Sequence, residues 1–253
     1  MTWHLFKHEN LLNAEDEDWH LQTWAWMLKH CGGTIRLRRS PLVTPTDEFF
    51  PPVGLTGEKL AQSIFDRVRK FADMQPVVCE LIGERGDLEF AGELASGRNV
   101  YRSRCGGFHE DESGVIITYD PALTANPMSL VSVLAHEVAH YRVAHVDEAP
   151  PGGDEMKEYT TDLMTVFLGF GIFGADAAFR FWQRSGRGQW RFSRSGYLRE
   201  IDWAYALAVF SFLRGDDVTP LKQWVKPTIY VEIVEASKDI ASDPSRLDAL
   251  RRL

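Results

Sequence analysis

Cysteine is scarce in this 253-residue sequence, which contains only Cys31, Cys79 and Cys105. The number is odd, the spacings are wide and no CxxC pair occurs, so the sequence predicts neither a disulfide framework nor a cysteine zinc site. A secretory signal is also missing, because residues 1–12 carry two histidines and a glutamate where such a signal needs a continuous apolar run. We therefore expect reduced thiols in a cytoplasmic protein.

Long apolar runs are absent as well. The most apolar stretch extends from Leu163 to Phe179, but Asp176 interrupts it, and Asp162 and Arg180 flank it. It is shorter than the ~20 apolar residues that cross a bilayer, so the sequence predicts a buried helix and no membrane span.

Positive charge is too scarce for general binding to nucleic acid. The formal net charge is −8, which favours solubility and disfavours attraction to nucleic acid or an anionic membrane. The exception is residues 180–199, where six arginines alternate with aromatic residues and no acidic residue intervenes. Such a segment can bind nucleic acid or an acidic peptide. Because arginine stems also cover apolar surface, we favour a structural role for it and do not expect a nucleic-acid partner.

The overall composition is that of a globular protein, with 44% hydrophobic and 25% charged residues. Four prolines between Ser40 and Gly57 mark the expected boundary between an N-terminal helical segment with its linker, residues 1–50, and a main domain, residues 51–253. Strands followed by packed helices indicate an α+β fold. Apolar spacing and capping residues predict strands at 77–82, 88–94 and 115–119, and helices at 15–30, 56–74, 127–146, 155–173, 196–214 and 227–241.

The clearest motif is HEVAH, an instance of HExxH that begins at His136. Asn126 and Pro127 suit the start of the helix that contains it, Asn as the cap and Pro at the first helical position. Residues four apart share a helix face, so His136 and His140 lie about 6 Å apart along the axis and can bind one zinc ion. Glu137, at the edge of that face, can reach a water on the metal and act as a general base.

A third metal ligand is expected on the next helix, because catalytic zinc sites usually have three protein ligands. The Pro- and Gly-rich turn at 149–153 predicts that this helix, capped by Asp154, runs antiparallel to the first. Counting along both helices places Glu158 level with His140, and Asp162 level with His136. Glu158 is therefore the candidate third ligand, and Asp162 can accept the free ring N–H of His136.

Over about residues 115–165 the chain resembles the gluzincin metallopeptidases, in which HExxH is followed by ExxxD on the next helix; here HEVAH is followed by Glu158 and Asp162. The resemblance implies a zinc metallopeptidase acting on peptide or protein substrates. It also implies a zincin-like α+β fold with a helical C-terminal half, in which 115–119 is an edge strand that pairs with the substrate and packs on the active-site helix. The residues it implies are His136, His140 and Glu158 as zinc ligands, Glu137 as the base and Asp162 as the partner of a ligand histidine.

The metzincin pattern HExxHxxGxxH does not fit, because Val143 and Val146 occupy its glycine and third-histidine positions. His145 is one residue too early, and we expect a structural role for it. A developing oxyanion beside zinc benefits from an added donor. The candidates for that role, among which the sequence does not choose, are Tyr197, Tyr159 and His109.

Two other interpretations stay open. Glu17 with His20, and Glu137 with His140, form two ExxH units of the kind that di-iron bundles use, although the predicted strands argue against an all-α fold. A catalytically silent regulatory or scaffolding protein could also keep the zinc site on a zincin fold. It would differ from an enzyme in whether Glu137 faces an open cleft.

Overall fold

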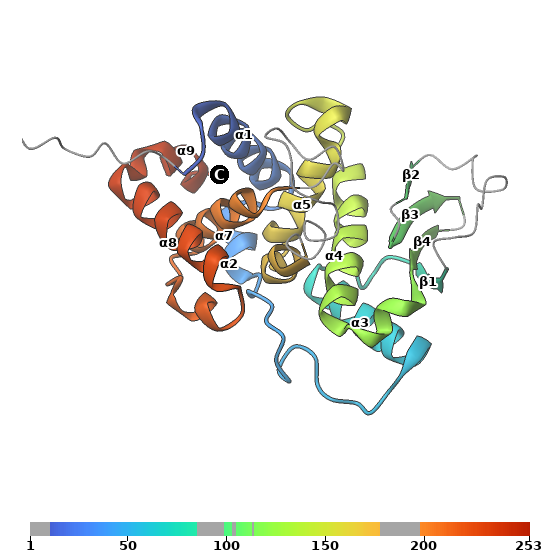
Figure 1. The fold of residues 1–253 in the computed structure, drawn as a ribbon. Coiled ribbons are helices and arrows are strands. Elements are labelled where there is room, and N and C mark those ends of the chain that lie inside the picture. The colour runs from blue at the N-terminus through green and yellow to red at the C-terminus, as the bar shows by residue number, and fades with distance from the viewer. Residues whose placement is uncertain (1–10, 85–98, 103–104, 113, 178–197) are drawn as a thin grey trace, which may run out of the picture.

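The fold is α+β and mostly helical, with a small sheet at one end (Figure 1). The computed structural model describes residues 11–84, 99–102, 105–112, 114–177 and 198–253. The α+β class predicted from the sequence is confirmed. Among the helices of these residues, none is both long and apolar enough to cross a membrane.

The sheet contains four strands in the order β1-β4-β3-β2. β1 is parallel to β4, and the other neighbouring pairs are antiparallel. The strands predicted at 77–82 and 115–119 are confirmed as β1 and β4, whereas residues 88–94 lie outside the described part of the chain. The bounds are β1 (Cys79–Gly83), β2 (Asn99–Arg102), β3 (Gly106–Asp111) and β4 (Gly114–Tyr119).

The prediction that 115–119 forms an edge strand is wrong. β4 pairs with β1 on one side and with β3 on the other, where Phe108 lies opposite Ile117. Within the described residues, β1 and β2 are the edges of the sheet. The error comes from β3, whose glycines and charged residues lack the β-branched pattern of a strand. Gly114, at φ 140°, begins β4 in a conformation that other residues rarely adopt.

Helix α4 (Pro127–Ala144) carries the HEVAH motif and lies between the sheet and α5 (Lys157–Phe167), as Figure 1 shows. The predicted start is confirmed: the Asn126 side chain accepts a hydrogen bond from the Ser129 amide at 3.3 Å, and Pro127 is the first helical residue. α3 (Gly57–Phe71) also packs on α4. α4 therefore has neighbours on several faces, and its histidine face is directed to α5.

Helix α5 differs from its prediction at both ends. A 3-10 turn, η2 (Gly153–Met156), precedes it, so Asp154 does not cap it and Met156 stands at the cap without a side-chain bond. The helix stops at Phe167, because Gly169 adopts φ 96° and its carbonyl accepts the Val43 amide at 2.9 Å. Helical structure resumes at 171–177. The predicted continuous helix over 155–173 is therefore wrong.

The N-terminal helices pack against the C-terminal half of the chain. α1 contacts α5 and α9, and α2 contacts α7. Gly32, in the left-handed conformation at φ 92°, follows the last turn of α1 and is the N-cap of α2. The sequence did not predict α2. Residues 41–56 contain no helix or strand, as expected. The bounds are α1 (Ala14–His30), α2 (Gly33–Arg39), α7 (Glu200–Arg214), α8 (Pro227–Ser242) and α9 (Asp248–Arg251), with 3-10 turns η1 (Pro121–Ala125), η3 (Thr219–Gln223) and η4 (Pro244–Leu247).

A buried polar network joins α1 to the start of α7. Asp202, only 1% exposed, accepts hydrogen bonds from the Arg199 side chain at 2.6 Å and 2.8 Å. The Nε2 of His20 lies 3.4 Å from Asp202 Oδ1, which is also the oxygen that accepts the 2.8 Å bond from Arg199. Arg199 also donates to Asp16 of α1 at 2.6 Å. Because each charge has a close partner, the network can lie in the interior without unpaired ions.

Acid is expected to destabilise the protein through Asp202. Burial alone would raise the pKa of Asp202, but hydrogen bonds from Arg199 and His20 lower it from 3.8 to about 2. A carboxyl with a depressed pKa stabilises the fold above its unfolded value, here by about 2 kcal/mol, and the contribution disappears as the pH falls from about 4 through about 2. Urea unfolding between neutral pH and pH ~2 measures this loss. Asp202→Asn should be less stable than wild type at neutral pH and should not lose this part of its free energy of unfolding in acid. The control Asp47→Asn, at an exposed position, should show the same pH dependence as wild type. If the stability of Asp202→Asn varies with pH as that of wild type does, the assignment is wrong.

Candidate metal centre

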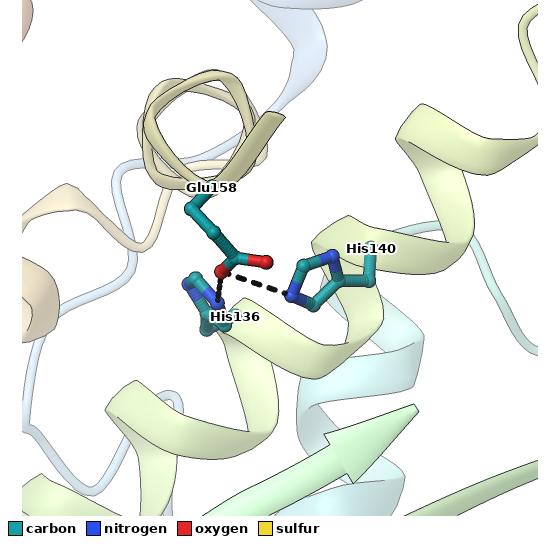
Figure 2. A group of neighbouring side chains, drawn as sticks. All are labelled: His136, His140 and Glu158. Atoms are coloured by element: carbon teal, nitrogen blue, oxygen red, sulfur yellow. Dashed lines mark hydrogen bonds and ion pairs between the residues drawn. The ribbon is translucent and has the colours of Figure 1, made fainter. Parts of the chain in front are cut away.

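Helices α4 and α5 bring His136, His140 and Glu158 together. Figure 2 shows the two rings, from successive turns of α4, pointing toward the same carboxylate oxygen of Glu158. Glu158 Oε2 lies 3.3 Å from His136 Nε2 and 3.4 Å from His140 Nε2. One ligand atom from each residue lies within 4.8 Å of the others. Both histidines are buried, while the Glu158 side chain is 37% exposed, so the group is reached by solvent from the α5 side.

These separations suit a tetrahedral metal ion. Two ligand atoms bonded at 2.0–2.1 Å with a tetrahedral angle between them lie about 3.3 Å apart. The two distances from Glu158 match that value. The ligand atoms of all three side chains lie within 4.8 Å of one another, so the group could hold a metal ion, and the set of two imidazoles and one carboxylate serves several divalent metals.

Asp162 is the outer partner of His136. Its Oδ1 lies 2.9 Å from His136 Nδ1, and its Oδ2 accepts the Leu198 amide at 3.0 Å. Asp162 is 3% exposed, so both contacts are shielded from water. With Nδ1 donating to a carboxylate, His136 directs Nε2 to Glu158, the orientation in which it could bind a metal ion.

Three residues near the histidines were missed by the sequence analysis. Thr161 Oγ1 lies 3.3 Å from His140 Nδ1. The Phe108 ring of β3 stacks on His140, with centroids 6.4 Å apart and planes 12° apart. Gly106 of β3 lies beside Glu137. Thr161 could have been noticed, because it follows Glu158 by three positions and shares its helix face. The other two depend on a strand that had not been predicted.

Glu137 lies against β3, beside Gly106, and is 2% exposed. A Cβ placed on Gly106 would lie 3.0 Å from Glu137 Oε1 and 2.7 Å from a Val133 methyl carbon. The glycine therefore lets the strand approach the carboxylate closely. Glu137 is next to His136 in the chain but is not among the three grouped ligands.

Burial and close charges shift the pKa values of this group. Burial opposes protonation of His136, but hydrogen bonds with Asp162 and Glu158 raise its pKa to about 10. Burial raises the pKa of Glu137 to about 8, against the attraction of His136. Burial would raise the pKa of Glu158, but both histidines hold it well below its ordinary value, and burial lowers the pKa of His140. A divalent cation would compete with protons at the rings and favour ionised Glu137.

Two of the candidate oxyanion stabilisers, Tyr159 and His109, lie on separate elements among the described residues. Tyr159 is 6% exposed, and its ring packs edge-on against Trp19 of α1 at 6.4 Å. Phe108 stacks on His140, so the alternation along β3 directs His109 to the other face of the sheet. There its Nε2 lies 3.4 Å from Asp111 Oδ2. Tyr197 lies outside the described residues, as does the arginine-rich stretch up to residue 197.

His145 has partners of its own. It ends α4, its Nδ1 lies 2.8 Å from the Tyr141 carbonyl, and its Nε2 lies 3.0 Å from Glu110 Oε1. These contacts give it a structural role at the end of the helix.

The second ExxH unit, formed by Glu17 and His20, contacts residues outside the candidate metal centre. Glu17 accepts hydrogen bonds from the Tyr205 hydroxyl at 2.8 Å and from Arg246 at 2.6 Å, while His20 meets Asp202. In the part of the chain that the structure describes, His136, His140 and Glu158 are the one group of three or more histidine, cysteine or carboxylate side chains that could hold a metal ion. The structure therefore does not join the two ExxH units into a dinuclear site.

Comparisons with protein-family models, with curated proteins and with solved structures find no match to this chain. Any functional conclusion consequently depends on the chemistry of the site itself.

Proposed function

We propose that the protein is a zinc-dependent metallopeptidase with a zincin-like active site. The proposal depends mainly on the two distances from Glu158 to His136 and His140, which are close to the separation of two ligand atoms in a tetrahedral zinc site. Glu137 is next to the first histidine in the chain. Zinc is the preferred ion because two imidazoles and one carboxylate, with a fourth position for water, are a ligand set of catalytic zinc. The packing of α4 between a mixed sheet and the ligand helix supports the zincin-like comparison.

The side chains have separate roles in this reaction. When bound, zinc supplies Lewis acidity that polarises a peptide carbonyl and makes water more acidic. Glu137 accepts the proton of the attacking water and delivers it to the leaving amine. Its buried position raises its pKa, which makes the carboxylate a stronger base once it is ionised. His136, His140 and Glu158 hold the ion, and Asp162 keeps His136 in the required orientation.

A second candidate function is supported by the burial of Glu137. At 2% exposed, this carboxylate has little room beside it for water and substrate. A zinc-binding protein with a regulatory or scaffolding role and no turnover would need no such room. The two functions agree on metal binding and differ in peptide hydrolysis.

Metal analysis of purified protein, combined with a peptide-library cleavage assay, tests both functions. Wild type should contain about one zinc per chain, and His136→Ala and His140→Ala should contain far less, because each loses a direct ligand. His145→Ala is the matched control and should retain zinc, since its ring is engaged with Glu110. Zinc without cleavage of any peptide would favour the silent protein. A chain without zinc, or with two irons, would contradict both proposals.

A further inference from the structure

The hydroxyl of Thr161 contacts two hydrogen-bonding groups, a backbone carbonyl and a histidine ring nitrogen. Its Oγ1 donates to the Lys157 carbonyl, one turn earlier in α5, at 2.9 Å. The same oxygen lies 3.3 Å from Nδ1 of His140. Thr161 is fully buried and His140 is 2% exposed, so water does not compete for either contact.

The proton count of this arrangement decides the state of His140. A hydroxyl carries one proton and two lone pairs. Because the Thr161 proton is used toward Lys157, the oxygen can only accept from His140. Nδ1 of His140 then carries a hydrogen, and the lone pair of the neutral ring is on Nε2. That nitrogen is the one that lies 3.4 Å from Glu158 Oε2.

We propose that Thr161 is a positioning residue that fixes His140 with Nδ1 protonated and Nε2 directed to the metal. The inference rests on the metal binding proposed above, and it gives α5 three tasks at one site. Glu158 binds the ion, Thr161 orients the second histidine and Asp162 orients the first. Positions i, i+3 and i+4 share a helix face, so a single turn of α5 supplies all three.

A neutral partner at position 161 suits the charge of the site. Two carboxylates, from Glu158 and Asp162, already lie against the two histidines and balance the charge of one divalent ion. A further carboxylate beside His140 would add a negative charge that the ion cannot neutralise, at a high cost in a buried site. Thr161 orients the ring without that charge.

The simpler alternative is that Thr161 has only a helical role. Buried threonines often bond the carbonyl four residues earlier. Thr165 does so, one turn along α5, with its Oγ1 donating to the Thr161 carbonyl at 3.0 Å. Thr165 is equally buried, and among the described residues its hydroxyl bonds this carbonyl and no histidine. It is therefore a matched control for the loss of such a bond.

The experiment compares Thr161→Val, Thr161→Ser and Thr165→Val in the full chain. Zinc affinity is measured by competition with a chelator, and thermal unfolding is recorded for each variant. Thr161→Val removes the acceptor and should weaken zinc binding about 10–100-fold, as loss of an outer partner does. Thr161→Ser keeps the acceptor and should bind zinc nearly as wild type does, even where the lost methyl group lowers stability. Thr165→Val should bind zinc as wild type does.

Nitrogen-15 spectra of the histidine rings provide a readout that packing alone would not change. In the zinc-loaded wild type, His140 should carry a slowly exchanging proton on Nδ1, and in Thr161→Val that proton should exchange faster. Zinc bound through Nδ1 of His140 would overturn the inference without any variant. So would unchanged affinity in Thr161→Val, or an equal loss in Thr165→Val. If wild type binds no zinc, both the metal site and this inference are wrong. If the three variants show the expected zinc affinities but no peptide is cleaved, the role of Thr161 stands and only the hydrolase proposal is wrong.

Discussion

Glu137→Gln should keep zinc in the protein and lower peptide hydrolysis by about 10²–10⁴-fold, the usual contribution of a general base. The substitution conserves shape and removes only the ability to accept a proton. Glu137 is not among the three side chains that group as candidate metal ligands. The fold and the metal ligands should therefore be unaffected. Initial rates on the best substrate, with zinc content measured on the same sample, test the expectation.

A matched control for this variant is Glu155→Gln, in the exposed turn that precedes α5. It should keep both zinc and activity. If Glu137→Gln cleaves peptide at the wild-type rate, Glu137 is not the base. If it loses zinc together with activity, Glu137 supports the metal and not the proton transfer.

Glu158→Ala should lose zinc far more readily than Asp162→Asn, with wild type retaining it best. Glu158 is the candidate ligand, with one oxygen 3.3 Å and 3.4 Å from the two ring nitrogens, so its removal deletes a bond to the ion. Asp162 touches only the far side of His136. Its replacement releases one ring, a change that usually costs about 10–100-fold in affinity or activity. Zinc release is followed during titration with a chelator.

Asp154→Ala is the control for this series, because Asp154 is exposed and lies in the turn before α5. It should retain zinc as wild type does. Retention of zinc at the wild-type level in Glu158→Ala would remove Glu158 from the site. Equal loss in Glu158→Ala and Asp162→Asn would mean that α5 holds the metal through its overall position rather than through a direct bond.

The helix of the motif could be predicted because its determinants are local. Asn126, Pro127 and the spacing of the histidines lie within one helix, and capping and helical phase depend on neighbouring residues. Glu158 and Asp162 required only one further step, the short turn between antiparallel helices. The details of the predicted turn are wrong, since Asp154 does not cap α5. Glu158 and Asp162 still lie opposite the two histidines, because their position along the helix depends on the length of the turn and not on the capping residue.

The parts that could not be predicted depend on contacts between distant segments. The break in α5 is set by Gly169, where a Cβ would lie 2.1 Å from the Pro41 carbonyl oxygen. The close contact of β3 with Glu137 depends on Gly106, one of two adjacent glycines that in the sequence suggest only a loop. Similarly, Gly32 suits the end of the first helix, but the sequence does not show that α2 begins directly after it, because a left-handed glycine serves both purposes.

The carboxylate of Asp162 binds with both oxygens, one toward His136 and the other toward the amide of Leu198. The next residue, Arg199, is paired with Asp16 of the first helix. Any coupling between these two contacts would be reciprocal: if a change at Leu198 altered the affinity for metal, binding of metal would alter the stability of the Leu198 contact by the same free energy. Leu198 and Arg199 therefore form a short path of contacts from the proposed metal site to the N-terminal helix, along which such an effect could be measured.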